Sequence, residues 1–309
     1  MNLDHRRWLG AMATAGALMT SAATAHAQAT ARNAGEFEAH AARSTTDETR
    51  FRLQVGASLA TGNTRSFNGN FAGRFLLRRG LAQLTIDGAV NYGRAAVATA
   101  DMATGARVFG PDQTTAENYL GRGRLDLFFE RNTSIYIGLL AFRDQPSGFN
   151  SRVSGQIGVL RNFINLPDRR RFWGEAGYDL TYENLNSPMP VMGANCTSAS
   201  PPECWRLLHM ARLFLGFEEH ATASLDLTAG VEGLMNVLNP SDFRINGTIG
   251  LASKIGDDFS LALTLTARYI HEPINGRDPL DTVTLVSVIY QRAFEVAPPP
   301  APVAAGGGR

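Results

Sequence analysis

The sequence lacks the features of a helical membrane protein and of a nucleic-acid-binding protein. After the first 27 residues, no stretch approaches the roughly twenty consecutive apolar residues that a membrane-spanning helix requires. The formal net charge is only +1, and Lys254 is the only lysine among 29 Lys and Arg residues. Without a basic excess there is no general attraction for nucleic acid. A helical membrane protein is therefore excluded, and nucleic acid is not expected as a partner.

The N-terminal segment has the parts of a secretory signal peptide. Arg6 and Arg7 supply a positive region, and a short stretch rich in Ala and Thr follows. The tripeptide 25–27 (Ala-His-Ala) fits the small-x-small cleavage pattern. We expect residues 1–27 to be removed, so that the mature chain begins at Gln28. A helical anchor is the weaker alternative, because the apolar stretch is too short to span a bilayer.

The two ends of the mature chain carry no periodic pattern. Residues 28–50 are small and polar, which predicts a flexible periplasmic lead-in. Residues 295–309 are rich in proline and glycine, and proline cannot donate to a strand ladder. This composition predicts a disordered tail. Between them, residues 51–294 contain no linker and are expected to form one domain.

The central segment is made of short ribbons with one apolar and one polar face. Phe67 and Phe71 share one parity, whereas Asn70 and Arg74 share the other. Side chains on a strand point to opposite faces with period two, so each ribbon reads as a strand. The predicted strands are 51–60, 66–77, 81–93, 117–130, 133–143, 150–162, 171–183, 205–218, 223–236, 242–254, 258–271 and 281–293.

The connections between these strands alternate in length. Residues 131–132 and 256–257 are tight turns, whereas 94–116 and 184–204 are long loops. Short turns at one rim and long loops at the other are typical of outer-membrane barrels. The even strand count places both termini at the short-turn rim. The predicted fold is an all-β, closed, antiparallel transmembrane barrel of about 12 strands with an up-and-down meander, in the outer membrane of a Gram-negative bacterium.

The apolar face of the ribbons is predicted to face lipid. A barrel of twelve strands encloses a space too wide for side chains to fill easily, so the polar face should line the lumen. A charge exposed to hydrocarbon would cost about 2–4 kcal/mol. The predicted lumen charges are Arg52, Arg74, Asp87, Arg122, Arg124, Asp126, Glu130, Arg152, Glu175, Asp179, Glu183, Arg206, Arg212, Glu218, Asp226, Glu232, Arg244 and Arg268. Because both signs are interspersed, a bracing network is favoured over a selectivity lining.

Two strands leave their inward face open to either reading. In the fifth predicted strand, Tyr136 and Phe142 would face inward as an apolar patch, unless the parity there is reversed. In the last strand, Val288 competes with Ile289 for the lipid side. Outside these strands, aromatic residues fall at the strand ends, where girdles are expected: Tyr92, Tyr119, Tyr182 and Tyr269 at outer ends, and Phe129, Phe172 and Phe217 at inner ends.

The two cysteines lie close together in one long loop. Cys196 and Cys204 flank seven residues. An exported protein folds in an oxidising compartment, so a loop-closing disulfide is predicted. A metal site is the rival reading, but no cluster of His or carboxylates accompanies the thiols.

Catalytic signals are weak. A barrel hydrolase needs a Ser nucleophile beside a His base, and the best-placed histidine, His209, is predicted to face lipid with no Ser among its neighbours. The loop residues Asp101, Asp112 and Glu117 could bind a divalent cation such as calcium, but scattered loop carboxylates are usually just solvated. We expect no enzyme, no metal and no cofactor.

One turn resembles a known family. The turn Thr61-Gly62-Asn63-Thr64 is similar to the Gly-Asn-Thr turn that opens YdiY-like proteins, a family of uncharacterised, salt-induced outer-membrane proteins. The closing segment from Asp281 to Phe294 resembles the family too. The likeness covers roughly residues 50–294. It implies a transmembrane barrel with no established substrate and no catalytic residues.

Three functions remain open from the sequence. The first is a narrow passive channel for ions or small solutes, and the second is a structural or stress-response envelope protein with an occluded lumen. The third, an outer-membrane lipid hydrolase, is the weakest, as is a soluble two-sheet fold. The expected partners are outer-membrane lipids and, during insertion, the barrel-assembly machinery. The barrel is expected to be monomeric.

Overall fold

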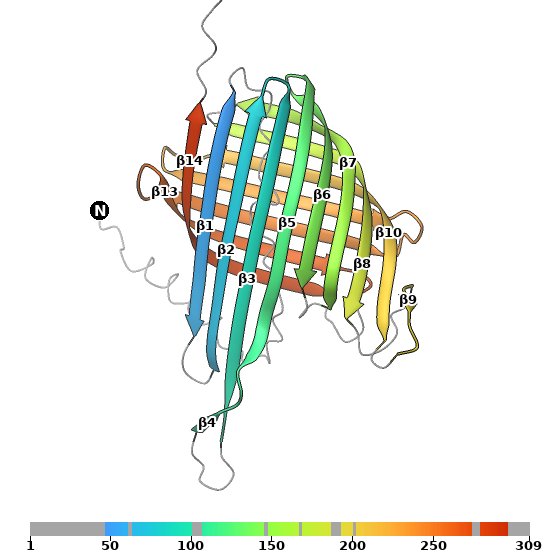
Figure 1. Cartoon of the computed structure of the whole chain (residues 1–309). Helices are drawn as coiled ribbons and strands as arrows, with labels where there is room; N and C mark the ends of the chain where they lie inside the picture. Colours follow the sequence, from blue (N-terminus) through green and yellow to red (C-terminus); the bar gives the residue numbers. More distant parts are fainter. Residues whose placement is uncertain are drawn as a thin grey trace, which may run out of the picture.

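Twelve long strands in the described part of the chain form a closed antiparallel barrel (Figure 1). The computed structural model describes residues 47–60, 64–100, 107–144, 148–166, 169–186, 193–199, 202–273 and 279–295. The long strands are β1 (Glu48–Ala60), β2 (Thr64–Arg79), β3 (Ala82–Ala100), β5 (Gln113–Glu130), β6 (Thr133–Asp144), β7 (Phe149–Leu166), β8 (Arg170–Asn186), β10 (Glu203–His220), β11 (Leu225–Asn236), β12 (Phe243–Lys254), β13 (Phe259–Ile270) and β14 (Leu280–Glu295). The predicted fold class is confirmed.

The barrel closes by pairing its first and last strands. Each long strand pairs with the next one along the chain, and β1 also pairs with β14 from Glu48–Glu295 to Gly56–Ser287. The ladders are antiparallel throughout, as expected for strands joined by direct turns. The described residues contain no helix that could span a membrane.

Two short strands pair with the long-loop ends of long strands. β4 (Arg107–Phe109) pairs with the end of β3, and β9 (Asn195–Cys196) pairs with the start of β10. Figure 1 shows both at the lower end of the view, beside the lower ends of β3 and β10. They escaped prediction because two or three residues are too few to show a period.

The strand boundaries differ from the predicted ones mainly at the ends. β1 begins at Glu48 and not at residue 51, because residues 48–50 pair on both sides, with β2 and with β14. The last three residues of the predicted lead-in therefore belong to the barrel. β14 runs to Glu295. The predicted signal peptide and the remainder of the tail lie outside the described residues.

The two rims of the barrel differ, and we name them by their connections. At the tight-turn end, β2 and β3 are joined by Gly80 and Leu81, and Gly80 has a φ of +55°, which glycine adopts without strain. At the long-loop end, β8 and β10 are separated by residues 187–202, which include β9. The N-terminal end of β1 and the C-terminal end of β14 both lie at the tight-turn end, as the even strand count requires.

The structure settles the two ambiguous strands. Tyr136 is 1% exposed and Phe142 is 4% exposed, so the apolar patch of β6 does face inward. In β14, Ser287 and Ile289 are buried whereas Val286 and Val288 are exposed. Valine therefore takes the outer face of that strand.

Candidate functional site: the ion-pair network of the lumen

The lumen is lined mainly by the polar parity of the strands, with apolar inward residues on β6. The wall is a single sheet, so a strand side chain that is almost fully buried must point inward. Thirteen of the charges predicted for the lumen are buried in this way: Arg74, Asp87, Arg124, Asp126, Arg152, Glu175, Asp179, Glu183, Arg206, Arg212, Glu232, Arg244 and Arg268. The strand register places many of them directly beside one another, and this proximity creates the network.

The simplest part of the network is a row across three neighbouring strands. Arg74 on β2, Asp87 on β3 and Arg122 on β5 are partners in register. Asp87 accepts hydrogen bonds from Arg74 and from Arg122, whose Nη2 lies 2.7 Å from Oδ2. One carboxylate therefore holds two guanidinium groups along the wall. Charge-assisted hydrogen bonds of this kind are the strong ones.

A second part reaches over intervening strands. Arg124 Nη1 on β5 lies 2.9 Å from Glu175 Oε1 on β8, although β6 and β7 stand between them. The same Glu175 accepts from Arg212 Nη1 at 2.6 Å, and Arg212 Nε lies 2.7 Å from Glu232 Oε1 on β11. Asp126 completes the set, 2.8 Å from Arg124. This series of ion pairs extends into the lumen and connects non-adjacent strands of the wall.

Tyr136 lies within this central group because glycines leave it space. Its hydroxyl accepts a hydrogen bond from Arg212 at 2.8 Å, and the Arg124 guanidinium lies 3.8 Å from its ring centroid. A Cβ added at Gly158 or Gly177 would lie 2.6 or 2.7 Å from the Tyr136 hydroxyl oxygen. The ring therefore rests on a backbone floor, where a cation–π contact adds to the ion pairs.

Three arginines surround one carboxylate nearer the long-loop end. Glu183 lies 2.6 Å from Arg152, 2.7 Å from Arg206 and 2.7 Å from Arg244. Its side chain is fully buried. A buried charge is tolerated only when it is paired and hydrogen-bonded, and this cluster satisfies that condition for one glutamate with arginines from three strands.

One ion pair joins opposite walls. Arg268 on β13 lies 3.8 Å from Asp144 on β6. In the strand order, six steps separate β6 from β13 in either direction around the barrel. This pair therefore crosses the full width of the lumen.

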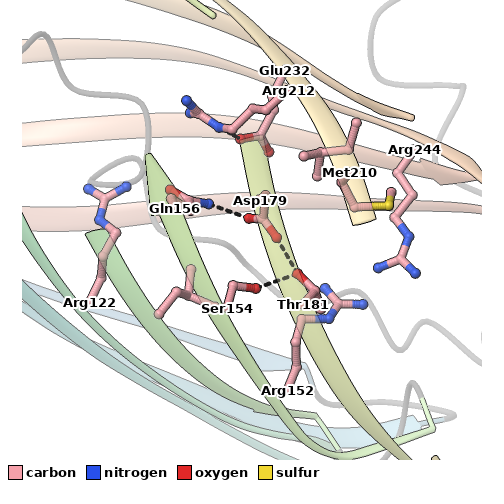
Figure 2. A pocket seen from close by; sticks show the side chains of 12 residues that line it. Arg122, Arg152, Ser154, Gln156, Asp179, Thr181, Met210, Arg212, Glu232 and Arg244 are labelled. Carbon is pink, nitrogen blue, oxygen red and sulfur yellow. Dashed lines mark hydrogen bonds and ion pairs between the residues drawn. The ribbon is translucent and has the colours of Figure 1, made fainter. Parts of the chain in front are cut away.

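A small polar cavity remains between these clusters (Figure 2). Its volume is about 40 Å³, and its lining includes Arg122, Arg152, Arg212 and Arg244. Asp179 lies at its centre, where it accepts hydrogen bonds from Gln156 at 2.6 Å and from Thr181. A water needs about 10–15 Å³ on this measure, so the cavity has room for a few waters.

The opposite part of the wall carries small side chains. In and near the tight-turn half of β11–β14, most inward residues are small, and Ile289 is a larger buried exception. The small ones include Thr228, Gly230, Thr248, Gly250, Ala262, Thr264, Thr266 and Ser287. Thr248 Oγ1 donates to the Leu265 carbonyl at 3.2 Å and lies 3.3 Å from the Thr266 hydroxyl. We call this region the small-residue wall.

Bulky side chains occupy the facing half. The bulky wall comprises the inward residues Arg124, Phe128, Tyr136, Trp173, Arg212 and Phe214 in the tight-turn half of β5–β10. Trp173 packs on Phe214, with ring centroids 5.9 Å apart, and on Gly216, where an added Cβ would overlap the indole ring.

The long-loop mouth holds an apolar cluster and the disulfide. Cys196 on β9 and Cys204 on β10 are joined, and Cys204 is fully buried. Cys204 packs in a cluster with Leu140, Phe142, Phe149, Leu185 and Ile270, which Cys196 covers from one side. The disulfide therefore fixes β9 against the inner surface of the mouth.

Four of the predicted lumen charges are less deeply placed. Arg52 and Arg122 are partly buried on inward positions. Asp226 lies at the tight-turn rim, where its Oδ1 is 2.6 Å from His220 Nδ1. Glu218 is also at this rim and pairs at 2.5 Å with Arg171, its register partner on β8.

Glu130 is a correction. The register of β5 shifts between Phe128 and Glu130, and such a bulge reverses the parity of the residues that follow it. Glu130 is consequently exposed and pairs with Arg161 at 2.7 Å on the outer rim surface. It is not a lumen residue.

Sequence reasoning missed several members of the network. The predicted strand ends at residue 143, whereas Asp144 is the last residue of β6 and meets Arg268. Asn70, Asn91 and Asn118 form a hydrogen-bonded row across β2, β3 and β5, with Asn91 to Asn118 at 2.5 Å. Their shared parity was a usable signal, because an amide on the lumen face has the same need for a partner as a charge.

The outward face at the tight-turn end carries a further ion pair. Arg170 on β8 lies 2.6 Å from Glu219 on β10, and both are partly exposed. The hydrogen bond from Arg170 lowers the pKa of the Glu219 carboxyl. On the same face nearer the other end, the Tyr178 hydroxyl lies 2.5 Å from His209 Nδ1, so His209 faces outward.

The whole barrel matches one protein family. The family model described as "Protein of unknown function, DUF481" matches residues 53–291. The chain belongs to the DUF481 family. The matched residues begin in β1 and end in β14, so the DUF481 model spans the complete barrel. Of the predicted family-like turn, Thr61, Gly62 and Asn63 lie outside the described residues, and Thr64 begins β2.

Solved barrels are similar to this DUF481 chain in outline. The NanC porin in a rhombohedral crystal form is 8% identical, with a TM-score of 0.45 over 80% of this chain and 99% of that one. The COG4313 outer-membrane channel from Pseudomonas putida F1 is 11% identical, with a TM-score of 0.44 over 85% and 99%. Among curated proteins, none matches the DUF481 chain at a significant level.

Proposed function

We propose that the chain is an outer-membrane β-barrel of a Gram-negative bacterium, with its apolar face in lipid and its ion-pair network in the lumen. The observation that carries this is the inside-out distribution of side chains. Val55, Phe71, Leu139, Leu213 and Ile249 are 50–68% exposed on outward positions, whereas charges are buried inward. In water, an apolar surface of this size would cause aggregation, whereas the hydrocarbon tails of lipids solvate it.

Membrane insertion can be tested directly. The protein without residues 1–27 should fold only in detergent or lipid vesicles, where an intact barrel resists protease and migrates faster on an unheated gel. Monodisperse folded protein in plain buffer would contradict the proposal. Export through the signal peptide predicts that the mature protein begins at Gln28, which intact-mass measurement of the membrane fraction would check.

Within the membrane, the lumen is proposed to be closed to solutes. The support is the set of ion pairs that occupy it: Arg124 with Glu175 over two intervening strands, and Arg268 with Asp144 across its full width. The central cavity of about 40 Å³ is of the size of a few waters. A braced, occluded barrel serves as a structural envelope protein, and the resemblance to YdiY-like proteins supports a role under salt stress.

A narrow ion conduit is the second candidate, and the small-residue wall favours it. The hydroxyls of Thr248, Thr264 and Thr266 and the bare backbone at Gly230 and Gly250 line one side of the lumen with small polar groups. Such a surface can solvate a passing ion without holding it tightly.

Planar-bilayer conductance separates the two candidates. For the occluded barrel, the folded wild type should give no discrete current steps, and the charge-neutral double variant Glu175→Ala/Arg212→Ala should open steps by emptying the centre. Thr248→Ala, on the opposite wall, is the matched control and should stay silent. Reproducible unitary steps in the wild type that change in Thr248→Ala would replace the occluded barrel with the conduit.

A further inference from the structure

An apolar groove crosses the outer face of the barrel over β8, β10, β11, β12 and β13. Its volume is about 430 Å³. The floor is formed by the small residues Ala229, Gly247 and Ala267, and taller side chains such as Leu215 and Ile249 border it. In register, Phe172, Phe217, Ala229, Ile249 and Leu265 form one row across the five strands.

The dimensions of the groove fit one acyl chain. Four strand spacings of roughly 4.8 Å give a length of about 19 Å along the row. One leaflet of a bilayer is about 15 Å of hydrocarbon, and a groove that runs perpendicular to tilted strands is oblique to the membrane normal. An acyl chain that lies along the groove would thus extend through about the depth of one leaflet.

A cationic patch adjoins the end of the groove nearest the tight-turn rim. Phe172 and Phe217 bound this end, and the Arg170 guanidinium lies 6.0 Å from the Phe217 ring centroid. Arg169 is the exposed neighbour of Arg170, and its carbonyl accepts from the His220 amide. Within the described residues of this patch, two arginines stand against one carboxylate, Glu219, which pairs with Arg170.

We propose that this groove binds one anionic phospholipid of the periplasmic leaflet, with an acyl chain along Ala229, Gly247 and Ala267 and the phosphate at Arg169 and Arg170. Arginine binds phosphate oxygens through a planar fork of donors, which suits it to this role. The inference rests on the proposed placement of the barrel in the outer membrane.

A second copy of the chain does not fit the groove. Two rows of residues are roughly 7 Å apart, so the groove offers about 130 Å² of surface. A stable protein–protein interface buries about 1,000 Å² or more. The narrow shape and the cation at one end therefore favour a lipid over a protein partner.

Native mass spectrometry of the folded protein tests the proposal. Phosphatidylglycerol, phosphatidylethanolamine and phosphatidylcholine of matched chain length are offered in turn to the detergent-solubilised barrel. We expect the wild type to retain one phosphatidylglycerol roughly tenfold more strongly than phosphatidylcholine, the effect of one good ion pair. Equal retention of the three lipids would overturn the proposal.

Variants separate the two halves of the site. Gly247→Leu should fill the floor and abolish retention of the single lipid, and its Cβ meets nothing closer than the Gly230 oxygen at 4.0 Å. Gly121→Leu, where an added Cβ also meets nothing within 4 Å, is the matched control on another part of the wall and should bind as the wild type does. Retention in Gly247→Leu equal to that of the control would exclude the groove.

The charge half of the site has its own test. Arg169→Gln should remove the preference for phosphatidylglycerol, whereas Glu219→Gln should raise it because Arg170 loses its competing partner. An unchanged preference in both variants would exclude the patch. The unheated gel shift is recorded for each variant, so that a failure to fold or insert, which would contradict the proposed membrane barrel, is distinguished from loss of the lipid.

Discussion

The bulky wall and the small-residue wall follow the same period-two pattern but make different interiors. On β5–β10, Arg124, Tyr136, Trp173 and Arg212 fill the lumen and pair across it. On β11–β14, Thr248 and its neighbours are too small to fill the lumen. Their hydroxyls form hydrogen bonds within their own part of the wall. Alternation alone therefore determines the barrel, and the size of the inward side chains determines whether the barrel is filled.

The two walls also differ in how far the stabilising contribution of an inward side chain depends on its partners. An inward arginine of the bulky wall is stable only with its partners in place, because a buried charge without a partner costs several kcal/mol. A threonine of the small-residue wall can bond its own backbone ladder. We expect mutations on the bulky wall to be coupled to one another and those on the small-residue wall to be independent.

The largest effect is expected at Glu175. Glu175→Gln removes the carboxylate that Arg124 and Arg212 share, and the free energy of unfolding should fall by about 3 kcal/mol, the lower range for a broken buried ion pair. Urea unfolding of the barrel in lipid vesicles measures it. A loss no larger than that of a small-residue-wall variant would remove the energetic contrast between the walls.

A smaller loss is expected where the bulky wall rests on backbone. Gly216→Ala would place a Cβ inside the Trp173 ring, so the indole must shift, at a cost of about 1–3 kcal/mol for overpacking. The near-ultraviolet circular dichroism of Trp173 should change as well. Gly233→Ala, where an added Cβ meets nothing within 4 Å, is the control and should leave both measurements unchanged.

The small-residue wall should respond weakly. Thr248→Val keeps the shape of the side chain and removes one hydroxyl that donates at 3.2 Å, so we expect a loss of about 1 kcal/mol or less. The same urea titration checks this. A loss that matches Glu175→Gln would show that the small-residue wall also bears the stability of the barrel.

The smallest effect lies outside both walls, at the Arg170–Glu219 rim pair. The hydrogen bond from Arg170 lowers the pKa of Glu219. A lowered carboxyl pKa stabilises the fold above the ordinary pKa of glutamate, and this contribution disappears as the pH falls through the lowered value. Glu219→Gln should slightly flatten the loss of stability on acidification, and a curve identical to that of the wild type would show that the pair contributes nothing.

Much of the fold could be predicted because a barrel repeats one simple rule. The parity of Phe71 against Arg74 already placed one face inward, and the same alternation recurs in most of the long strands. In β6 the inward residues Tyr136 and Phe142 are apolar, so polarity alone could not decide the face there. The prediction failed where the rule is locally broken. The register shift beside Phe128 moved Glu130 outward, and β9 is too short for any period to be visible.

The network itself was only partly predictable. Register places Arg74, Asp87 and Arg122 side by side, and strand pairing from the sequence foresees such neighbours. The contact from Arg124 to Glu175 passes over two strands, and it depends on the glycines beneath Tyr136. Likewise, Arg268 meets Asp144 only because the barrel closes to a particular width. Contacts through space depend on dimensions that no local pattern contains.

The pairing of β1 with β14 has a consequence for biogenesis. The partner of the first strand to emerge from the ribosome is the last one to be synthesised, some 230 residues later. Until β14 is in place, a partly assembled sheet has two unpaired edge strands, each able to pair with other chains. A truncated chain that ends before residue 280 should consequently aggregate in the periplasm. Assembly of the barrel therefore requires the full-length chain and chaperones that keep it unaggregated until β14 can pair.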